Sequence, residues 1–103
     1  MNELDELPVA QLALPDVLHA LSDPTRLAVL AQLERNGELP CGALDVRVAK
    51  STLSQHLRVL REAGVTRTRP DGNVRYLSVR RGELDHAFPG LLDAVLSACP
   101  PAR

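Results

Sequence analysis

The chain has 103 residues, the length of one ordinary domain, and 45% of them are hydrophobic, which is enough for a core. Aromatic residues make up only 2%, so this core must be built from Leu, Val and Ala, a composition that suits packed helices. No apolar run approaches the roughly 20 residues of a membrane span. The acidic start MNELDELP lacks the basic region of a secretory signal. We therefore expect a cytoplasmic protein that is not bound to a membrane.

Charge is strongly polarised along the chain, although the net charge is only −1. Residues 47–81 contain nine Lys or Arg residues and two acidic ones, whereas residues 1–46 contain two basic and eight acidic residues. A local basic block is the electrostatic signature of phosphate binding, whatever the overall charge. The alternative is a solvated basic face with no partner.

The N-terminal part predicts a loose arm and a short helix. Residues 1–13 are acidic and broken by Pro8, and Pro15 suits the first turn of a helix. The apolar face of this helix comprises Val17, Leu18 and Leu21.

A second helix is predicted from about residue 24 to residue 35. Asp23 can cap it, Pro24 can open it and Gly37 can end it. Arg26 falls in its first turn, where a cation opposes the helix dipole. This predicts either a bound anion such as a phosphate or a salt bridge to a nearby acid. The expected core stripe is Leu27, Leu30 and Leu33.

The next segment predicts a helix-turn-helix. An extended link over residues 38–41 leads to about two helical turns over 42–48, and a longer helix follows over 49–64. We expect Ser51 to cap this longer helix and Gly64 to end it. Its apolar stripe is Leu53, Leu57 and Leu60.

The opposite face of the longer helix carries short hydrogen-bonding groups and one cation. Such residues near the N-terminus of a helix are suited to base edges in a major groove. The alternative is an ordinary amphipathic surface helix. The residues concerned are Thr52, Ser54, Gln55, His56 and Arg58.

A change of period from 3.6 to 2 after Gly64 predicts a β-hairpin. Its strands are residues 65–69 and 74–79, and its turn is residues 70–73. An arginine-bearing hairpin after a recognition helix is typical of a wing that contacts phosphate or the minor groove. Alternatively, these charges only prevent edge-to-edge aggregation. The arginines are Arg67, Arg69, Arg75, Arg80 and Arg81.

Helix is predicted again over residues 82–98, with a break at Pro89-Gly90 that leaves the dimer geometry open. The apolar residues exceed what a small domain needs to cover itself, so we expect a dimer surface with the first helix. Its expected members are Val17, Leu18, Leu21, Leu84, Phe88, Leu91, Leu92 and Val95.

From Leu18 to about Val79 the chain resembles the ArsR/SmtB family of bacterial winged-helix repressors. The matching runs are LHALSDPTRLAVLAQL, STLSQHLRVLREAGV and the arginine-bearing hairpin. The resemblance implies a mainly α winged helix-turn-helix with a β-hairpin wing over residues 1–103, in which residues 1–13 form an arm and 83–98 dimerisation helices. It also implies a homodimer that binds double-stranded operator DNA and is released by an inducer. The implied DNA contacts are Ser51, Thr52, Ser54, Gln55, His56, Arg58, Arg67, Arg69 and Arg75.

The chain departs from the metal sensors of that family. Cys41 stands alone where they carry Cys-x-Cys, and Asp85 and His86 are adjacent with no later His. Two ligands fall short of the four usual in a structural zinc site, so we expect no metal and no cofactor. Cys41 and Cys99 resemble the thiol switch of the sulfide-responsive members, and the alternative is two small buried hydrophobic residues.

Our main interpretation is a sequence-specific dimeric repressor without a complete metal site, whose operator and inducer stay open. One alternative is a thiol-responsive repressor, and another is a winged-helix adaptor whose basic face binds an acidic protein. An enzyme with Cys41 as nucleophile is disfavoured, because no His and Asn or Asp set and no Gly-rich phosphate loop accompanies that residue.

Overall fold

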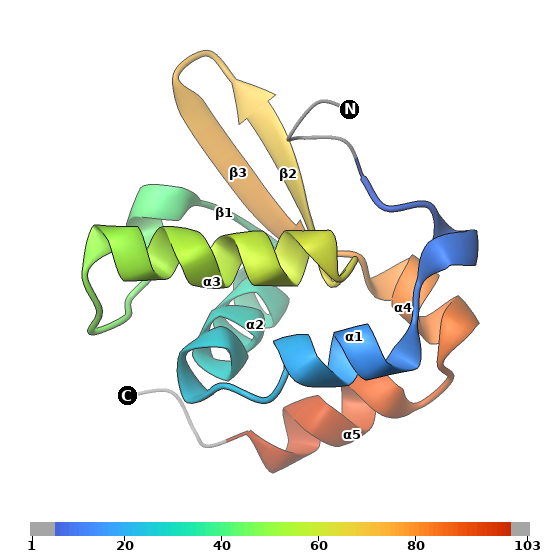
Figure 1. The fold of residues 1–103 in the computed structure, drawn as a ribbon. Coiled ribbons are helices and arrows are strands. Elements are labelled where there is room, and N and C mark those ends of the chain that lie inside the picture. The colour runs from blue at the N-terminus through green and yellow to red at the C-terminus, as the bar shows by residue number, and fades with distance from the viewer. Residues whose placement is uncertain (1–5, 100–103) are drawn as a thin grey trace.

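The structure is a computed structural model that describes residues 6–99. Helices pack beneath a small sheet, and the β2–β3 hairpin projects away from them (Figure 1). In chain order the elements are the 3₁₀ helix η1 (Val9–Gln11), α1 (Leu14–Ala20), α2 (Pro24–Asn36), β1 (Glu38–Pro40), the 3₁₀ helix η2 (Cys41–Ala43), α3 (Lys50–Glu62), β2 (Thr66–Asp71), β3 (Val74–Val79), α4 (Arg81–Ala87) and α5 (Leu91–Ala98).

The predicted boundaries of α2 are confirmed. Asp23 is its N-cap, and its Oδ2 accepts hydrogen bonds from the amides of Thr25 (2.8 Å) and Arg26 (3.1 Å). Gly37 ends the helix with a φ of 81°. The core stripe differs from the prediction at one position, because Leu27 is only partly buried and Val29 is fully buried instead. The buried apolar residues of α2 are therefore Val29, Leu30 and Leu33.

Helix α3 begins two residues earlier than a Ser51 cap requires, so that prediction is wrong. Its N-cap is Ala49, which makes no side-chain capping bond, and Ser51 lies exposed in the first turn. The C-terminal prediction is confirmed. The amide of Val65 donates to the Leu60 carbonyl (2.9 Å), and Gly64, at a φ of 85°, donates to Arg61 (3.0 Å). This pair of bonds is the Schellman ending that a left-handed glycine permits.

The helix predicted over residues 42–48 is wrong. Only the short η2 forms, and the chain from Leu44 to Ala49 runs without helix or strand into α3. The side-chain amide of Gln32 in α2 explains this. Its Nε2 donates to the Asp45 carbonyl and its Oε1 accepts from the Asp45 amide, both at 2.8 Å. With both backbone groups of Asp45 bound to Gln32, the chain is held in a non-helical path here.

The predicted hairpin is confirmed, and it forms part of a three-stranded antiparallel sheet in the order β1–β3–β2. The extended link before η2 is a strand that pairs with β3, Leu39 opposite Leu77. Pro70 and Asp71 belong to β2 rather than to the turn. The turn is the two residues Gly72 and Asn73, and a first turn residue with a positive φ (61°) is typical of a type II′ hairpin.

The C-terminal helix is broken where the sequence predicts, between α4 and α5. Gly90 adopts the left-handed conformation (φ 84°) and is the N-cap of α5. Leu84 and Leu92, one from each helix, are buried in the core of the chain, and Phe88 packs against it. Within residues 6–99 no helix is long and apolar enough to cross a membrane.

Candidate nucleic-acid interface

Helix α3 presents a polar row to solvent. Ser51, Ser54, Gln55 and Arg58 are exposed along its outer side. The apolar residues on the other side hold the helix on the protein: Leu60 is fully buried, and Leu53 and Leu57 pack against the core. Because 3.6 residues make one turn, these two sets lie on opposite faces. The outer row is thus free to enter a groove.

His56 lies on the inner side of α3, and only 17% of its side chain is exposed. Arg26 Nη1 lies 3.0 Å from its Nδ1. A guanidinium can only donate, so Nδ1 must be the acceptor and a neutral ring carries its proton on Nε2. That nitrogen is 3.7 Å from Asp23 Oδ2. The structure therefore connects His56 to the start of α2, and a base contact by this residue stays a prediction.

Arg26 is 8% exposed, and among residues 6–99 it binds backbone carbonyls and the His56 ring rather than a carboxylate; the alternative of a bound anion stays a prediction. Its Nε donates to the Ala20 carbonyl (2.7 Å) and its Nη2 to the His19 carbonyl (3.1 Å). These carbonyls lie at the C-terminal end of α1, where orphan acceptors favour a cation. The unfavourable place of Arg26 at the start of α2 is thus offset by a favourable one at the end of α1.

A shallow depression of about 300 Å³ lies on the α2 side of the polar row. Thr52 stands on this flank of α3, together with Val59, rather than at the centre of the outer face. The depression is lined by Arg26, Ser51, Thr52, Gln55, His56 and Val59.

Arg67 and Arg69 of β2 point to the face of the sheet away from α3. Side chains alternate along a strand, and the intervening Thr68 lines a cavity beside α3. Arg67 binds the carboxylates of Glu6 and Glu83. Arg69 binds Glu38 (2.8 Å) and lies over the ring of Tyr76, 4.6 Å from its centroid. The bond from Arg69 lowers the pKa of Glu38.

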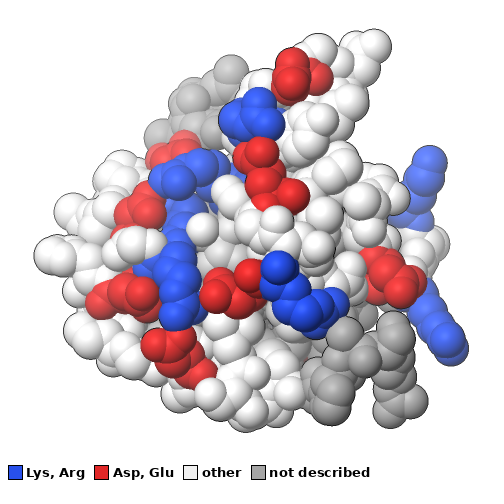
Figure 2. Space-filling view, turned by 180° about the vertical axis from the view of Figure 1, so that it is seen from behind, with Lys and Arg blue, Asp and Glu red and all other residues white. Residues whose placement is uncertain are grey.

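The last two arginines of the basic block are also paired. Arg80 is 2% exposed and lies 3.4 Å from Glu83. Arg81 binds Asp93 of α5 and lies 3.4 Å from Glu34 of α2. In Figure 2, which shows the molecule from behind, basic side chains lie beside acidic ones. Much of the basic block is thus neutralised by acids from elsewhere in the chain.

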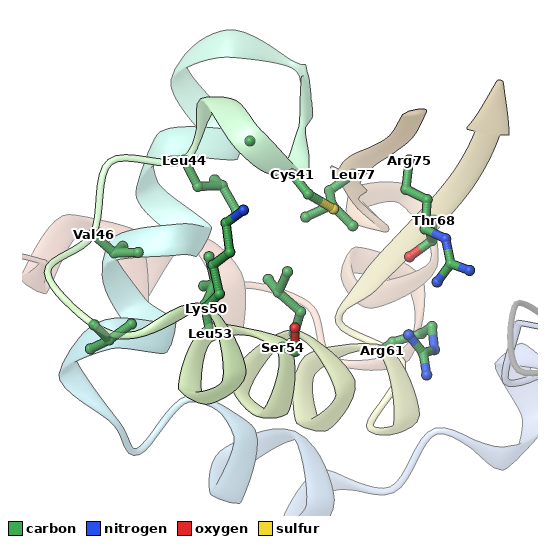
Figure 3. Close-up of a pocket in the computed structure, with 13 residues that line it drawn as sticks. Cys41, Leu44, Val46, Lys50, Leu53, Ser54, Arg61, Thr68, Arg75 and Leu77 are labelled. Carbon is green, nitrogen blue, oxygen red and sulfur yellow. The ribbon is translucent and has the colours of Figure 1, made fainter. Parts of the chain in front are cut away.

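Arg75 is placed differently from the other hairpin arginines. It lies on the α3 side of the sheet, at a cavity of about 540 Å³ between α3, the hairpin and residues 41–48 (Figure 3). Lys50 and Arg61 of α3 border the same cavity, and sequence reasoning missed both. The signal was available, because positions 50, 54 and 61 share one flank of a helix of 3.6 residues per turn.

The cysteines give no support to a reactive thiol. Both are free and partly buried. Cys41 lies at the edge of the cavity, where burial raises the pKa of its thiol despite the nearby charge of Arg75. A raised pKa leaves less of the reactive thiolate. Among residues 6–99 no three His, Cys, Asp or Glu side chains form a group that could hold a metal ion.

The residues expected at a dimer surface fall into two groups. Four of them, Val17, Leu21, Leu84 and Leu92, are buried in the core of the single chain. The other four keep exposed surface, and Leu18 is 47% exposed. Leu14, one helical turn before Leu18, is 42% exposed and was not foreseen. The four with exposed surface are Leu18, Phe88, Leu91 and Val95.

The α-helices that share one core in residues 6–99, a polar-faced α3 and a hairpin wing define a winged helix-turn-helix protein of the DNA-binding class. A family model described as a helix-turn-helix domain matches residues 21–69. The uncharacterized HTH-type transcriptional regulator YceK of Bacillus subtilis is 39% identical over 82 residues, which cover 77% of this chain and 82% of YceK.

Two solved structures agree with this assignment. One is an ArsR-family transcriptional regulator, with a TM-score of 0.65, 28% identity and 90% of each chain covered. The other is the transcriptional repressor BigR from Xylella fastidiosa, also with a TM-score of 0.65 and 28% identity, over 85% of this chain and 87% of that one. The chain belongs to the ArsR family of DNA-binding transcriptional regulators, which are not enzymes.

Proposed function

We propose that the protein is a dimeric repressor that reads a palindromic operator with the outer face of α3. The observation that carries this proposal is the exposed polar row of Ser51, Ser54, Gln55 and Arg58, opposite an apolar face fixed to the core. Gln and Arg can make bidentate contacts to base edges, and short hydroxyl groups can bind bases or phosphates. Thr52, on the flank of this row, contacts backbone phosphate.

The contacts within the chain refine the roles of the other expected residues. His56 acts as a positioning residue, because Arg26 already binds its ring. Arg75 is the wing arginine retained for DNA, since it lies on the α3 side of the sheet. Arg67 and Arg69 are assigned to the sheet, because carboxylates already bind them on the opposite face.

Dimerisation is proposed through α1 and α5, on the side of the molecule away from the hairpin (Figure 1). Leu14 and Leu18 leave an apolar strip on α1 that a second copy would cover. Two copies would place their α3 helices in successive major grooves about 34 Å apart. The expected result of Leu18→Glu is a monomer in analytical ultracentrifugation, and a dimer of unchanged stability would contradict this surface. Ala28→Glu, at an exposed position of α2, is the control.

Selection from a random duplex library tests the function. We expect enrichment of an imperfect palindrome whose half-sites lie about one helical turn apart. Gln55→Ala should then relax selectivity at one position per half-site, by about 1–3 kcal/mol against the wrong base. Gln11→Ala removes an exposed glutamine of η1 and is the matched control. Loss of all binding together as salt rises, with no enriched sequence, would favour the adaptor instead.

A further inference from the structure

The cavity between α3 and the hairpin has an apolar interior that the chain itself leaves unfilled. Leu44 and Val46 line it from the irregular segment, Leu53 from α3 and Leu77 from β3 (Figure 3). Leu57 of α3 also lines it. Four of these five side chains are only partly buried, although all five belong to or pack against the core. Apolar surface around a hollow of about 540 Å³ is typical of a site for a small organic ligand.

The charge around this cavity is of one sign. Lys50 extends into it from the first turn of α3, and Arg61 and Arg75 border it near the hairpin (Figure 3). None of its lining residues is acidic. Among residues 6–99, no carboxylate lies within ion-pair distance of Lys50 or Arg61. This contrasts with the outer face of the sheet, where Arg67 and Arg69 are bound to acids.

An apolar interior bordered by cations determines which class of ligand the cavity can bind. A neutral apolar molecule would fill the interior but would leave the cations solvated. A small anion alone would bind the cations but would leave the apolar surface in contact with water. A molecule with both an aliphatic tail and a carboxylate satisfies both parts, because apolar burial and charge-assisted hydrogen bonds then act together.

We infer that this cavity is the effector site of the protein and that it binds a small amphipathic organic acid, with the tail against the leucines and the carboxylate at Lys50. Its regulatory consequence rests on the proposed function. Ser54 belongs both to the cavity and to the outer row of α3. A ligand there engages Lys50, a cation that would otherwise be available to phosphate, so ligand and operator should weaken each other reciprocally.

Decanoate is the probe, tested on the full chain without DNA. Isothermal titration calorimetry should show saturable binding, and amide chemical shifts should move for Leu53, Leu57 and Leu77. Decanol, which lacks the charge, and butyrate, which lacks the tail, should each bind at least about tenfold more weakly, since each loses one of the two contributions.

Three variants test whether the ligand binds in the cavity. Lys50→Gln should weaken decanoate binding about tenfold, the loss expected for one charge-assisted contact, and Arg61→Gln, three helical turns away, should weaken it less. Val46→Trp fills the interior from a segment outside helix and strand and should abolish binding while both cations stay. Arg35→Gln, at an exposed position in the last turn of α2, should leave the decanoate affinity unchanged.

The outcomes separate this inference from the proposed function. Localised binding that also weakens operator affinity supports the effector site. No saturable binding by a protein that still selects an operator would overturn the site alone. Equal binding of butyrate and decanoate, or equal losses in the Arg35 variant, would overturn it as non-specific charge attraction. Localised binding without any change in operator affinity would overturn the effector role.

Discussion

The guanidinium of Arg26 lies 3.0 Å from Nδ1 of His56, and this contact joins three helices at one point. Arg26 is in α2, His56 is in the second turn of α3, and the same guanidinium binds the last carbonyls of α1. The recognition helix is therefore oriented by a buried cation that it does not itself carry. His56, for which the motif predicts a DNA contact, binds Arg26 inside the protein.

Arg26→Met should lower the free energy of unfolding by about 2–3 kcal/mol, because it leaves two carbonyls of α1 and the His56 ring without their donor. Urea denaturation measures this. Arg35→Met, an exposed change of the same kind, should cost less than about 0.5 kcal/mol. Equal effects of the two substitutions would show that the Arg26 contacts do not stabilise the fold.

The carboxyl group of Asp23 makes the free energy of unfolding depend on pH in the acid range. Partial burial raises its pKa, but the amide hydrogen bonds from Arg26 and Thr25 and the electrostatic effect of the His56 and Arg26 side chains outweigh this, so its pKa lies below 3.8. A depressed pKa in the folded state stabilises the fold above the unfolded value, and the stabilisation is lost as pH falls through the folded value.

Asp23→Asn keeps a capping oxygen but removes the titrating group. We therefore expect the variant to lose less stability than the parent protein between about pH 4 and pH 2, with urea unfolding as the measurement. Asp16→Asn removes a carboxylate from the first turn of α1 and controls for the change in net charge. A slope for Asp23→Asn as steep as that of the parent would contradict this origin.

Gly64 and Gly37 allow backbone strain to be separated from crowding. Both have a positive φ, 85° and 81°, but only at Gly64 would a Cβ overlap a neighbour, the Leu12 Cδ2 methyl. Gly37→Ala should cost about 1 kcal/mol from the left-handed backbone alone. Gly64→Ala should cost clearly more, by about 1–3 kcal/mol, because the arm must also move away from α3. Equal losses in thermal or urea unfolding would mean that the arm does not press on this turn.

Arg58, which forms no ion pair within residues 6–99, and the paired Arg69 should differ in the salt dependence of DNA binding. Arg58→Gln should reduce the slope of log affinity against log salt by about 0.9 if it neutralises one phosphate. Arg69→Gln should leave the slope nearly unchanged, since Glu38 and Tyr76 already engage this guanidinium. Fluorescence anisotropy over a range of salt concentrations measures both. If Arg69→Gln reduced the slope more than Arg58→Gln, the outer face of the hairpin would be part of the DNA-binding surface.

Sequence reasoning located the elements whose signals are local. The Asp23 cap, the Gly64 ending, the Gly72 turn and the break at Gly90 each depend on one or two neighbouring residues. Periodicity could also have placed His56 inside, because it lies three residues after Leu53 and four before Leu60. The expectation that it contacts DNA came from its place in the motif and stays a prediction.

The predictions that failed concern residues whose partners are distant in the sequence. Neither the Gln32 contact that prevents a helix at Asp45 nor the Glu38 that binds Arg69 can be recognised before the fold is known. The basic block therefore overstated the positive charge available on the wing. The cavity was equally invisible, because three separate segments line it.

Residues 44–49 form neither helix nor strand, so substitutions at these positions have different structural consequences from substitutions within a helix. In a regular helix-turn-helix, side chains there would be constrained by helix propensity and by packing against α3. In this chain the path is held by Gln32 through backbone atoms of Asp45, so the side chains of Leu44, Val46 and Val48 are not needed to form it. They face the cavity instead. Relatives could therefore exchange these three residues, and with them the shape of the hollow, while the helix that reads DNA stays in place.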